Sequence, residues 1–241
     1  MTSDTILAFK TFAEKLPKEK RDKVAFVLHT QPVDGNGTDL PAVVQEICPD
    51  LNIIFSTNKL SNQHLNYLYN IADVTINLAS NEGFGLGTCE SLMCGTPIIV
   101  NVTGGLQDQC GFEYKGKHLD YKDYSWVHSL HDWRTWENNE DLTHGEWVKP
   151  VWPRTRTLAG SPPTPYIFDD RCDWMDAAES ISYWYEVGDK KRQECGEIGH
   201  EWVSGDESMM SARWMCKNFE DHMNTALDKF QPRERYEVYK V

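Results

Sequence analysis

Hydrophobic and polar positions at the start of the chain predict a helix followed by a strand. Apolar residues within Thr5–Leu16 recur every three or four positions, which is the spacing of an amphipathic helix. Ser3 or Asp4 is expected to cap this helix. The charged stretch Lys18–Lys23 predicts a solvated connection, and the apolar run Val24–Leu28 predicts a buried strand.

The same alternation of helix and strand is repeated three more times. Helices are predicted over residues 40–47, 62–71 and 88–94, and strands over residues 52–56, 74–79 and 97–101. Ser61 is suited to cap the second of these helices. Strands that alternate with helices are typical of a parallel sheet covered on both faces. We therefore expect an α/β fold with a Rossmann-like parallel sheet.

Three glycines lie where the strand 74–79 gives way to the helix 88–94. Gly83, Gly85 and Gly87 let the backbone approach a ligand closely, because they carry no Cβ. Ligands bind α/β sheets at such carboxyl ends of strands, and the unpaired N–H groups of the next helix favour an anion such as phosphate. The third glycine of a dinucleotide-binding Gly-x-Gly-x-x-Gly pattern would fall at Glu90, which argues against a dehydrogenase.

Two carboxylates bracket these glycines. Glu82 and Glu90 offer acceptors for the vicinal hydroxyls of a sugar, so the stretch suits a ligand with both hydroxyls and phosphate, which is a nucleotide sugar. A purely structural interpretation stays open. Two glutamates at this spacing arise by chance, and a carboxylate near a helix start interacts favourably with the helix dipole.

The wider sequence around these residues resembles a known family. The runs Glu82–Glu90, Cys94–Ile99 and Gly104–Gly105 resemble the donor-site signature of retaining GT-B glycosyltransferases, in particular the group 1 family, also called family 4. Leu65–Val74 resembles the helix and strand that lead into this signature. The resemblance covers residues 5–109 and implies the C-terminal, donor-binding domain of the GT-B fold.

The resemblance also implies roles for individual residues. Glu90 would hold the ribose hydroxyls, and Glu82 would contact the donor sugar and support the positive charge that develops at its anomeric carbon. The residues expected to hold the sugar and the diphosphate are Asn81, Gly83, Phe84, Gly85, Leu86, Gly87 and Thr88. No metal is expected, because a helix terminus faces the diphosphate in GT-B enzymes, and the donor is a substrate rather than a cofactor.

Two further places are candidates for contact with the donor. The resemblance puts Asn58, Lys59 and Leu60 against the nucleotide base, and His29 follows the first strand at the ligand side of the sheet. A plain turn and a histidine satisfied at a strand end are equally good interpretations.

The region after the resemblance is different in character. Residues 107–165 are rich in aromatic and acidic side chains and predict an irregular insertion packed on the sheet. The last strands are expected over Trp147–Trp152 and Tyr166–Asp169, with a proline-rich loop over Pro153–Pro165. Arg154 and Arg156 in this loop are expected to be solvated, and contact with phosphate or acidic partners is the alternative. His128 and His131 are three apart, but no matching cysteine or carboxylate pattern supports a metal site.

The C-terminal part of the chain predicts helices. They are expected over Asp173–Val187, Lys190–Val203 and Glu207–Phe230, with Asp173 as a cap. Apolar side chains from Met209 to Met223 follow helical spacing and are expected in the core, although docking against another domain is an alternative. We divide the chain into one nucleotide-sugar-binding domain, 1–230, with the insertion at about 107–165, and a poorly ordered tail, 231–241.

The amino-acid composition argues against several classes of protein. The net charge of −13 over 241 residues disfavours binding to nucleic-acid backbones. No apolar run is long enough for a transmembrane helix, and the first residues lack the pattern of a signal peptide. The seven cysteines are odd in number and form no Cys-x-x-Cys pair, so we expect reduced thiols in a cytoplasmic protein.

These observations predict a retaining glycosyltransferase, or its donor-binding half, that transfers a sugar from a nucleoside diphosphate sugar to a glycan or another hydroxyl acceptor. In the family, a first domain holds the acceptor, and an arginine and a lysine at the start of the second neutralise the diphosphate. Neither is visible here, and Lys10 and Lys15 do not occupy the matching place, so we expect a missing N-terminal GT-B domain or subunit. The alternatives are a noncatalytic binding subunit of a split glycosyltransferase, and a sugar-nucleotide epimerase or phosphorylase of similar fold.

Overall fold

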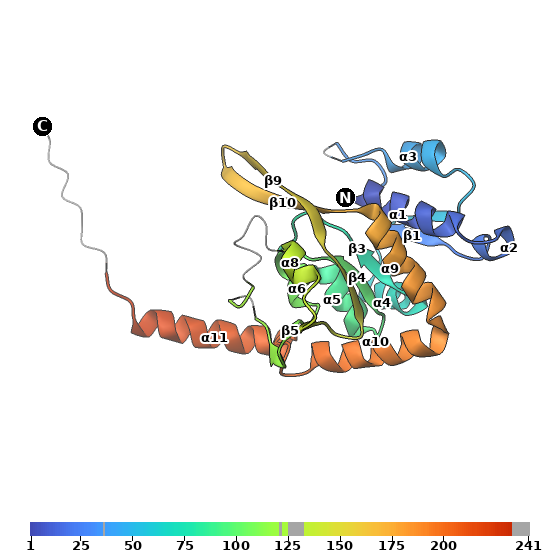
Figure 1. Ribbon diagram of the computed structural model, residues 1–241. Helices are drawn as coiled ribbons and strands as arrows, with labels where there is room; N and C mark the ends of the chain where they lie inside the picture. Colours follow the sequence, from blue (N-terminus) through green and yellow to red (C-terminus); the bar gives the residue numbers. More distant parts are fainter. Residues whose placement is uncertain (36, 121, 125–132, 233–241) are drawn as a thin grey trace, which may run out of the picture.

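The computed structural model describes residues 1–35, 37–120, 122–124 and 133–232. His128 and His131, for which no metal site was expected, lie outside the described residues, and so does most of the predicted tail. Figure 1 shows a body of strands and helices from which a long hairpin and the last helix project.

Within the described residues, the parallel strands form two separate sheets. The first pairs β1 (Phe26–His29) with β2 (Ile53–Ser56), and the second has the order β3 (Thr75–Asn77), β4 (Ile98–Asn101), β8 (Val148–Val151). This confirms the predicted α/β architecture, but the expected single sheet is divided between β1 and β3. The expectation of a buried first strand was wrong. Only Leu28 of β1 is buried, because β1 has a neighbouring strand on one edge alone.

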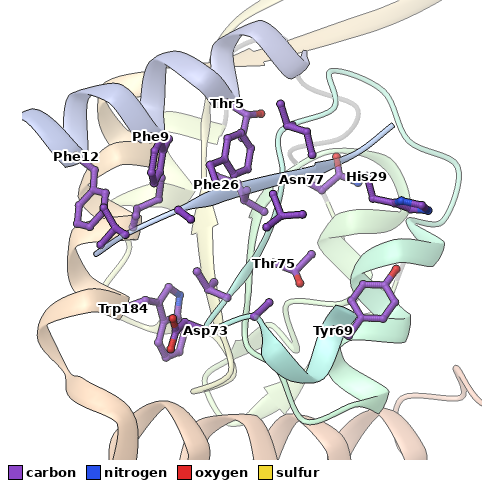
Figure 2. Close-up of a pocket in the computed structure, with 18 of the residues that line it drawn as sticks. Thr5, Phe9, Phe12, Phe26, His29, Tyr69, Asp73, Thr75, Asn77 and Trp184 are labelled. Atoms are coloured by element: carbon purple, nitrogen blue, oxygen red, sulfur yellow. The ribbon is translucent and has the colours of Figure 1, made fainter. Parts of the chain in front are cut away.

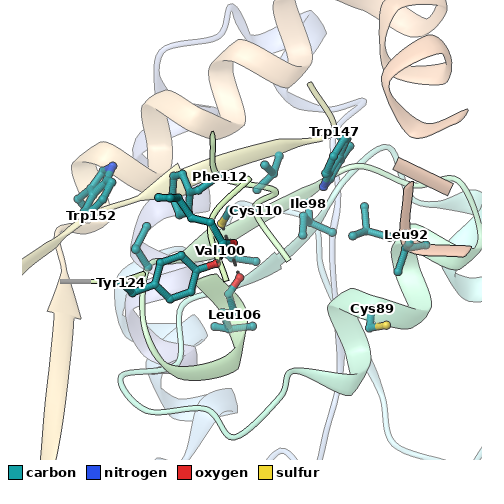
Figure 3. Packing of buried hydrophobic residues seen from close by; sticks show 14 residues of the cluster. Cys89, Leu92, Ile98, Val100, Leu106, Cys110, Phe112, Tyr124, Trp147 and Trp152 are labelled. Carbon is teal, nitrogen blue, oxygen red and sulfur yellow. Dashed lines mark hydrogen bonds between the residues drawn. The ribbon is translucent and has the colours of Figure 1, made fainter. Parts of the chain in front are cut away.

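The strand β4 shows how both faces of the second sheet are covered. Successive residues of a strand point to opposite faces, and all four residues of β4 are buried. Ile98 and Val100 belong to one apolar cluster with Leu92 of α5 (Leu86–Met93), as Figure 3 shows. Ile99 belongs to a second cluster, with Phe9 of α1 (Thr2–Glu14) and Ala177 of α9 (Trp174–Glu186). The helices therefore enclose the sheet from both sides.

The predicted helices are present, with small changes at their ends. Besides α1, α5 and α9, the predicted ones are α3 (Leu40–Ile47), α4 (Asn62–Ile71), α10 (Gly188–Ser204) and α11 (Ala212–Asp228). Three short helices of the described residues were not predicted, namely α2 (Lys18–Arg21), α6 (Gly104–Asp108) and α8 (Trp133–Glu137). Ser61 and Asp173 cap α4 and α9 as predicted, each accepting a hydrogen bond from a backbone N–H of the first turn. The predicted cap of α1 was wrong, because the helix already begins at Thr2 and so includes Ser3 and Asp4.

The region after α6 contains more strand than expected. A small antiparallel sheet has the order β6 (Lys117–His118), β5 (Glu113–Tyr114), β7 (Leu142–Thr143). The expected loop over Pro153–Pro165 was wrong. β9 (Pro153–Ser161) and β10 (Thr164–Cys172) form an antiparallel hairpin instead, and its prolines lie at the first strand position and around the turn, where a missing N–H is tolerated. The predicted strand Tyr166–Asp169 lies in this hairpin rather than in the parallel sheet.

The two arginines of β9 pair with carboxylates, which corrects the expectation of simply solvated side chains. Arg154 forms ion pairs with Glu137 of α8 and Asp176 of α9. Arg156 is buried with Asp170 of β10, and the two side chains are only 7% and 5% exposed. The sequence did not reveal these carboxylates, because each is brought to the hairpin by the fold.

The apolar stripe of α11 is exposed, so its assignment to the core was wrong. Met215, Phe219 and Leu227 each keep more than 60% of their accessible surface. Figure 1 shows α11 extending away from the sheets. The alternative, docking against another domain, stays a prediction. All seven cysteines are unpaired.

Candidate functional site

The glycine motif forms the start of α5. The loop Asn81–Gly85 leaves the carboxyl end of β3, and Gly85 takes the left-handed conformation, with φ of 88°, as the N-cap of the helix. The helix begins at Leu86, two residues before the predicted start. The N–H groups of Leu86, Gly87 and Thr88 therefore form the first turn, where backbone donors lack helical partners. These donors and the positive end of the helix dipole suit an anion.

The start of α6 packs against the backbone of the Asn81–Gly85 loop. The N–H group of Gly105 donates a hydrogen bond to the carbonyl of Glu82 at 2.9 Å. A Cβ on Gly104 would collide with the Glu82 backbone, and a Cβ on Gly105 would collide with the backbone of Gly83. The paired glycines of the family-like signature thus permit close packing of one backbone on another.

A buried glutamine side chain supports the loop from a second side. Gln109 is completely buried, and its Nε2 donates to the carbonyls of Phe84 at 2.6 Å and Gly85 at 3.0 Å. Sequence reasoning missed this residue, since a glutamine 24 positions away from Gly85 gives no local signal. Its contacts fix the carbonyls of the loop and so the direction of the neighbouring N–H groups.

The base of the β9–β10 hairpin supports the loop from a third side. The N–H group of Asp170 donates to the carbonyl of Ser80 at 2.8 Å. The carboxylate of Asp170 accepts a hydrogen bond from Thr103 Oγ1 at 2.9 Å and from Arg156 Nη2 at 2.9 Å. These residues hold the chain at the point where it enters the glycine loop.

Glu90 lies one turn inside α5 with an exposed side chain. Its Oε2 accepts a hydrogen bond from the hydroxyl of Tyr69 on α4 at 3.0 Å. Burial raises the pKa of Tyr69, and the Glu90 carboxylate raises it further, so the hydroxyl stays protonated and acts as a donor. Thr96 Oγ1 donates to the carbonyl of Tyr69 at 2.8 Å and ties α4 to the end of α5. Tyr69 was not predicted, because only the packing of two helices brings it to Glu90.

The remaining candidates lie around these elements. Glu82 is half-buried, and Asn81, Gly83, Phe84 and Leu86 are exposed. His29 and Ser56 are paired in the register of β1 and β2, and His29 Nδ1 lies 3.0 Å from Ser56 Oγ. The end of β1 therefore lies beside the start of the loop that carries Asn58, Lys59 and Leu60.

Comparisons with known proteins agree with this arrangement. Residues 43–142 match the family described as glycosyl transferases group 1. The matched region takes in β2, the glycine loop, α5, β4 and the paired glycines of α6. Over these residues the chain resembles a group 1 glycosyltransferase domain.

Individual relatives of this domain are similar over part of their length. The D-inositol 3-phosphate glycosyltransferase of Mycobacteroides abscessus is 32% identical over 97 residues, which are 39% of this chain and 20% of that protein. The enzyme of the same description from Salinispora tropica is 33% identical over 100 residues, 40% of this chain and 21% of that protein. The chain thus spans about a fifth of the length of these curated relatives.

Solved structures share the fold. A sucrose-phosphate synthase from Thermosynechococcus elongatus superposes with a TM-score of 0.57 at 17% identity, covering 94% of this chain and 42% of that one. A glycosyltransferase from Rickettsia africae gives a TM-score of 0.53 at 13% identity, covering 92% of this chain and 56% of that one. At these identities the likeness concerns the fold.

Within the described residues, no group of three or more histidine, cysteine, aspartate or glutamate side chains is arranged to hold a metal ion. Among the same residues, no helix has the length and apolar character needed to cross a membrane.

Proposed function

We propose that this domain is the donor-binding half of a retaining glycosyltransferase, which moves a sugar from a nucleoside diphosphate sugar to a hydroxyl acceptor such as a glycan. The observation that carries the proposal is the start of α5. There the Asn81–Gly85 loop is supported from three sides, its helix presents free N–H groups, and Glu90 lies one turn further along. The group 1 family match supports the same conclusion.

In this proposal Glu90 recognises the ribose of the donor. Tyr69 occupies one lone pair of Oε2, which leaves Oε1 and the outer lone pairs to accept hydrogen bonds from two vicinal hydroxyls. The hydrogen bond from Tyr69 also restricts the rotation of the carboxylate, so less conformational freedom is lost when the donor binds.

The glycine loop would serve the reacting part of the donor. The N–H groups from Gly83 to Thr88 would hold the sugar and the diphosphate, and would stabilise the negative charge that grows on the leaving group. Glu82 would contact the sugar and favour the developing positive charge at the anomeric carbon. His29 and the loop residues Asn58, Lys59 and Leu60 would border the base. No resident cofactor or metal has a part in this scheme.

The acceptor side belongs to a further part of the enzyme. The chain spans about a fifth of its curated relatives, and Arg154 and Arg156 are both engaged by carboxylates. We therefore assign the acceptor site, and the cations that neutralise the diphosphate, to an N-terminal GT-B domain or subunit. The second candidate function is a noncatalytic binding subunit. It is favoured by the same observation, because arginines that pair with carboxylates do not neutralise a diphosphate. As part of the proposal the protein works in the cytoplasm, which its unpaired cysteines support.

Calorimetric binding of nucleoside diphosphates and their sugars tests the proposal. A hydrogen-bond acceptor that is charged contributes about 1.5–3 kcal/mol, so Glu90→Ala is expected to weaken binding about 10- to 100-fold. Glu179→Ala, at an exposed position of α9, is the matched control and is expected to leave the affinity unchanged.

The outcomes separate the candidates. Selective binding that Glu90→Ala weakens and Glu179→Ala does not supports the donor site. Equal affinity for all three chains would contradict it. Where binding is selective, product analysis with an added acceptor and the N-terminal part distinguishes transfer from epimerisation, because only transfer requires an acceptor.

A further inference from the structure

The base of the β9–β10 hairpin lies at the edge of the sheet where the proposed donor site is found. Figure 2 shows Asn77 of β3 and His29 of β1 at the same end of their strands, with Asp73, which precedes β3, at the opposite end. The chain continues from this end of β3 to Ser80, whose carbonyl accepts a hydrogen bond from the N–H group of Asp170 at 2.8 Å. Ligands of α/β sheets bind at the carboxyl ends of the strands. The hairpin thus brings its own side chains to the edge at which a ligand is expected.

Asp170 anchors the base of the hairpin and leaves little freedom to its neighbours. Besides the bond to Ser80, its carbonyl accepts a hydrogen bond from Asn101 Nδ2 at 2.7 Å, and its carboxylate pairs with Arg156. Asp170 and Asn101 are both buried. The backbone of the preceding residue, Asp169, is therefore held in one place beside the glycine loop.

The Asp169 side chain lies on the other face of the hairpin from Asp170. Successive residues of a strand point to opposite faces, and the register of β9 and β10 is regular from Ile167 to Arg171. The residue opposite Asp169 on β9 is Thr157, which carries no charge. The carboxylate Oδ1 accepts a hydrogen bond from Ser80 Oγ at 3.4 Å, which is long beside the usual distance of about 2.7–2.8 Å. The hairpin is thus anchored by Asp170, and the Asp169 carboxylate contributes little to the anchor.

The Asp169 carboxylate is half-buried, and within the described residues it forms no ion pair. Arg171 lies two positions further along the same face of β10, but no salt bridge joins the two side chains in this part of the structure. Taking a carboxylate partly out of water is unfavourable unless hydrogen bonds or a cation compensate. A charged side chain that is held in place and short of donors is suited to accept hydrogen bonds from a ligand.

The position of Ser80 relates Asp169 to the reacting part of the donor. Ser80 is two residues before Glu82, and two residues of chain span at most about 7 Å. Asp169, through its contact with Ser80, therefore borders the same stretch of the loop as Glu82. Glu82 is the carboxylate that the proposed function places against the donor sugar. Both carboxylates can contact one sugar, because the hydroxyls of a sugar project in several directions.

We propose that Asp169 is a specificity-determining residue of the donor site, whose carboxylate accepts a hydrogen bond from a hydroxyl of the sugar that is transferred. This inference rests on the proposed function and narrows its substrate class. Asp169 and Glu82 place two negative charges beside the sugar, so the donor carries a neutral sugar with free hydroxyls. A uronic acid is disfavoured, because its own carboxylate would face two like charges.

Calorimetry with the full chain tests the proposal by comparing three ligands, namely the nucleoside diphosphate that binds best, its glucose derivative and its glucuronic acid derivative. Asp169→Ala is expected to weaken binding of the glucose derivative about tenfold or more, since a hydrogen bond to a charged group is lost. The affinity for the bare nucleoside diphosphate is expected to stay the same, which also shows that the variant is folded. Asp221→Ala, at an exposed position of α11, is the matched control and is expected to alter neither affinity.

A second variant tests the selection against charged sugars. Asp169→Asn keeps the size of the side chain and removes its charge. We expect it to raise the affinity for the glucuronic acid derivative, relative to that for the glucose derivative, at least about threefold, because one of the two like charges is gone.

The inference and the proposed function fail in different ways. If Asp169→Ala weakens the binding of all three ligands equally, the residue has a structural role, and if it weakens none, the residue does not contact the sugar. Equal affinity of the unmodified chain for the glucose and glucuronic acid derivatives would exclude the selection by charge. Each of these results overturns the inference and leaves the donor site in place. Failure of the unmodified chain to bind the bare nucleoside diphosphate would overturn the proposed function, and the inference with it.

Discussion

At the scale of single residues, the hydrogen bond from Tyr69 to Glu90 is the contact most open to a direct test. Tyr69→Phe removes the hydroxyl and keeps the ring. We expect donor affinity to fall about three- to tenfold, because one hydrogen bond to a charged group is lost while Glu90 remains. Calorimetry with the best nucleoside diphosphate of the panel measures this change.

The same helix supplies the control. Tyr67 is exposed, and its hydroxyl accepts a hydrogen bond from Gln63. Tyr67→Phe is expected to leave donor affinity unaltered. If both variants bind the donor as tightly as the unmodified chain, Tyr69 has no part in positioning Glu90.

Asp108, at the end of α6, predicts a pH dependence of stability. Burial raises the pKa of its carboxyl to about 6, against a smaller opposing effect of a hydrogen bond from Tyr124. The folded state thus binds the proton more tightly than the unfolded chain, whose aspartate pKa is about 3.9. The stability that comes from this proton is complete below about pH 4 and is lost as the pH rises to about 6.

Asp108→Asn removes this dependence and keeps an acceptor for Tyr124. At pH 7 the free energy of unfolding of the variant is expected to exceed that of the unmodified chain by about 1–2 kcal/mol. This value is smaller than the full pKa shift would give, because the carboxyl is partly solvated. Below about pH 4 the two chains should be equally stable. Urea unfolding at a series of pH values measures both, and a variant less stable at pH 7 would refute the account.

At the scale of elements, the hairpin holds the glycine loop through the buried pair of Arg156 and Asp170. Removing one partner leaves a buried charge, so Arg156→Met is expected to lower the free energy of unfolding by about 3–5 kcal/mol. Replacing both, as Arg156→Met with Asp170→Leu, should restore part of the loss. Denaturant titrations of the unmodified chain, the single variant and the double variant measure these free energies of unfolding. A loss below about 1 kcal/mol for the single variant would show that the pair contributes little.

The elements differ in how well the sequence predicted them, and the causes are physical. α3 and α4 match their predictions at both ends, because Asp39 and Ser61 cap them and apolar spacing is local information. The β9–β10 hairpin was missed, since its prolines favour a loop and its arginines find carboxylates on distant elements. α11 was placed in the core because helical spacing of apolar residues does not tell what covers them.

The residues of the candidate site also differ in whether the sequence could indicate them, because only some of them lie close together along the chain. Glu82, Glu90 and the glycines lie within ten residues of one another and carry a recognisable pattern. Gln109 and Tyr69 reach the site only through packing, so neither gave a signal in the sequence. The family resemblance predicts the ligand, whereas the structure shows which residues support the loop.

At the scale of the whole molecule, the chain combines a glycine loop that several elements hold in place with parallel strands that lie in two sheets. The loop is held by hydrogen bonds from α6, Gln109 and the hairpin. The parallel strands, by contrast, are divided between two separate sheets within the described residues.

The most direct test of the central claim is an NMR titration of the chain labelled with ¹⁵N at its glycines. We expect a nucleoside diphosphate to shift the amide resonances of Gly83, Gly85 and Gly87 in a saturable way, because the proposed site places the anion against these N–H groups. Gly188 and Gly205, at the two ends of α10, should not move. Saturable binding that leaves the three motif glycines unchanged would place the nucleotide elsewhere and contradict the account.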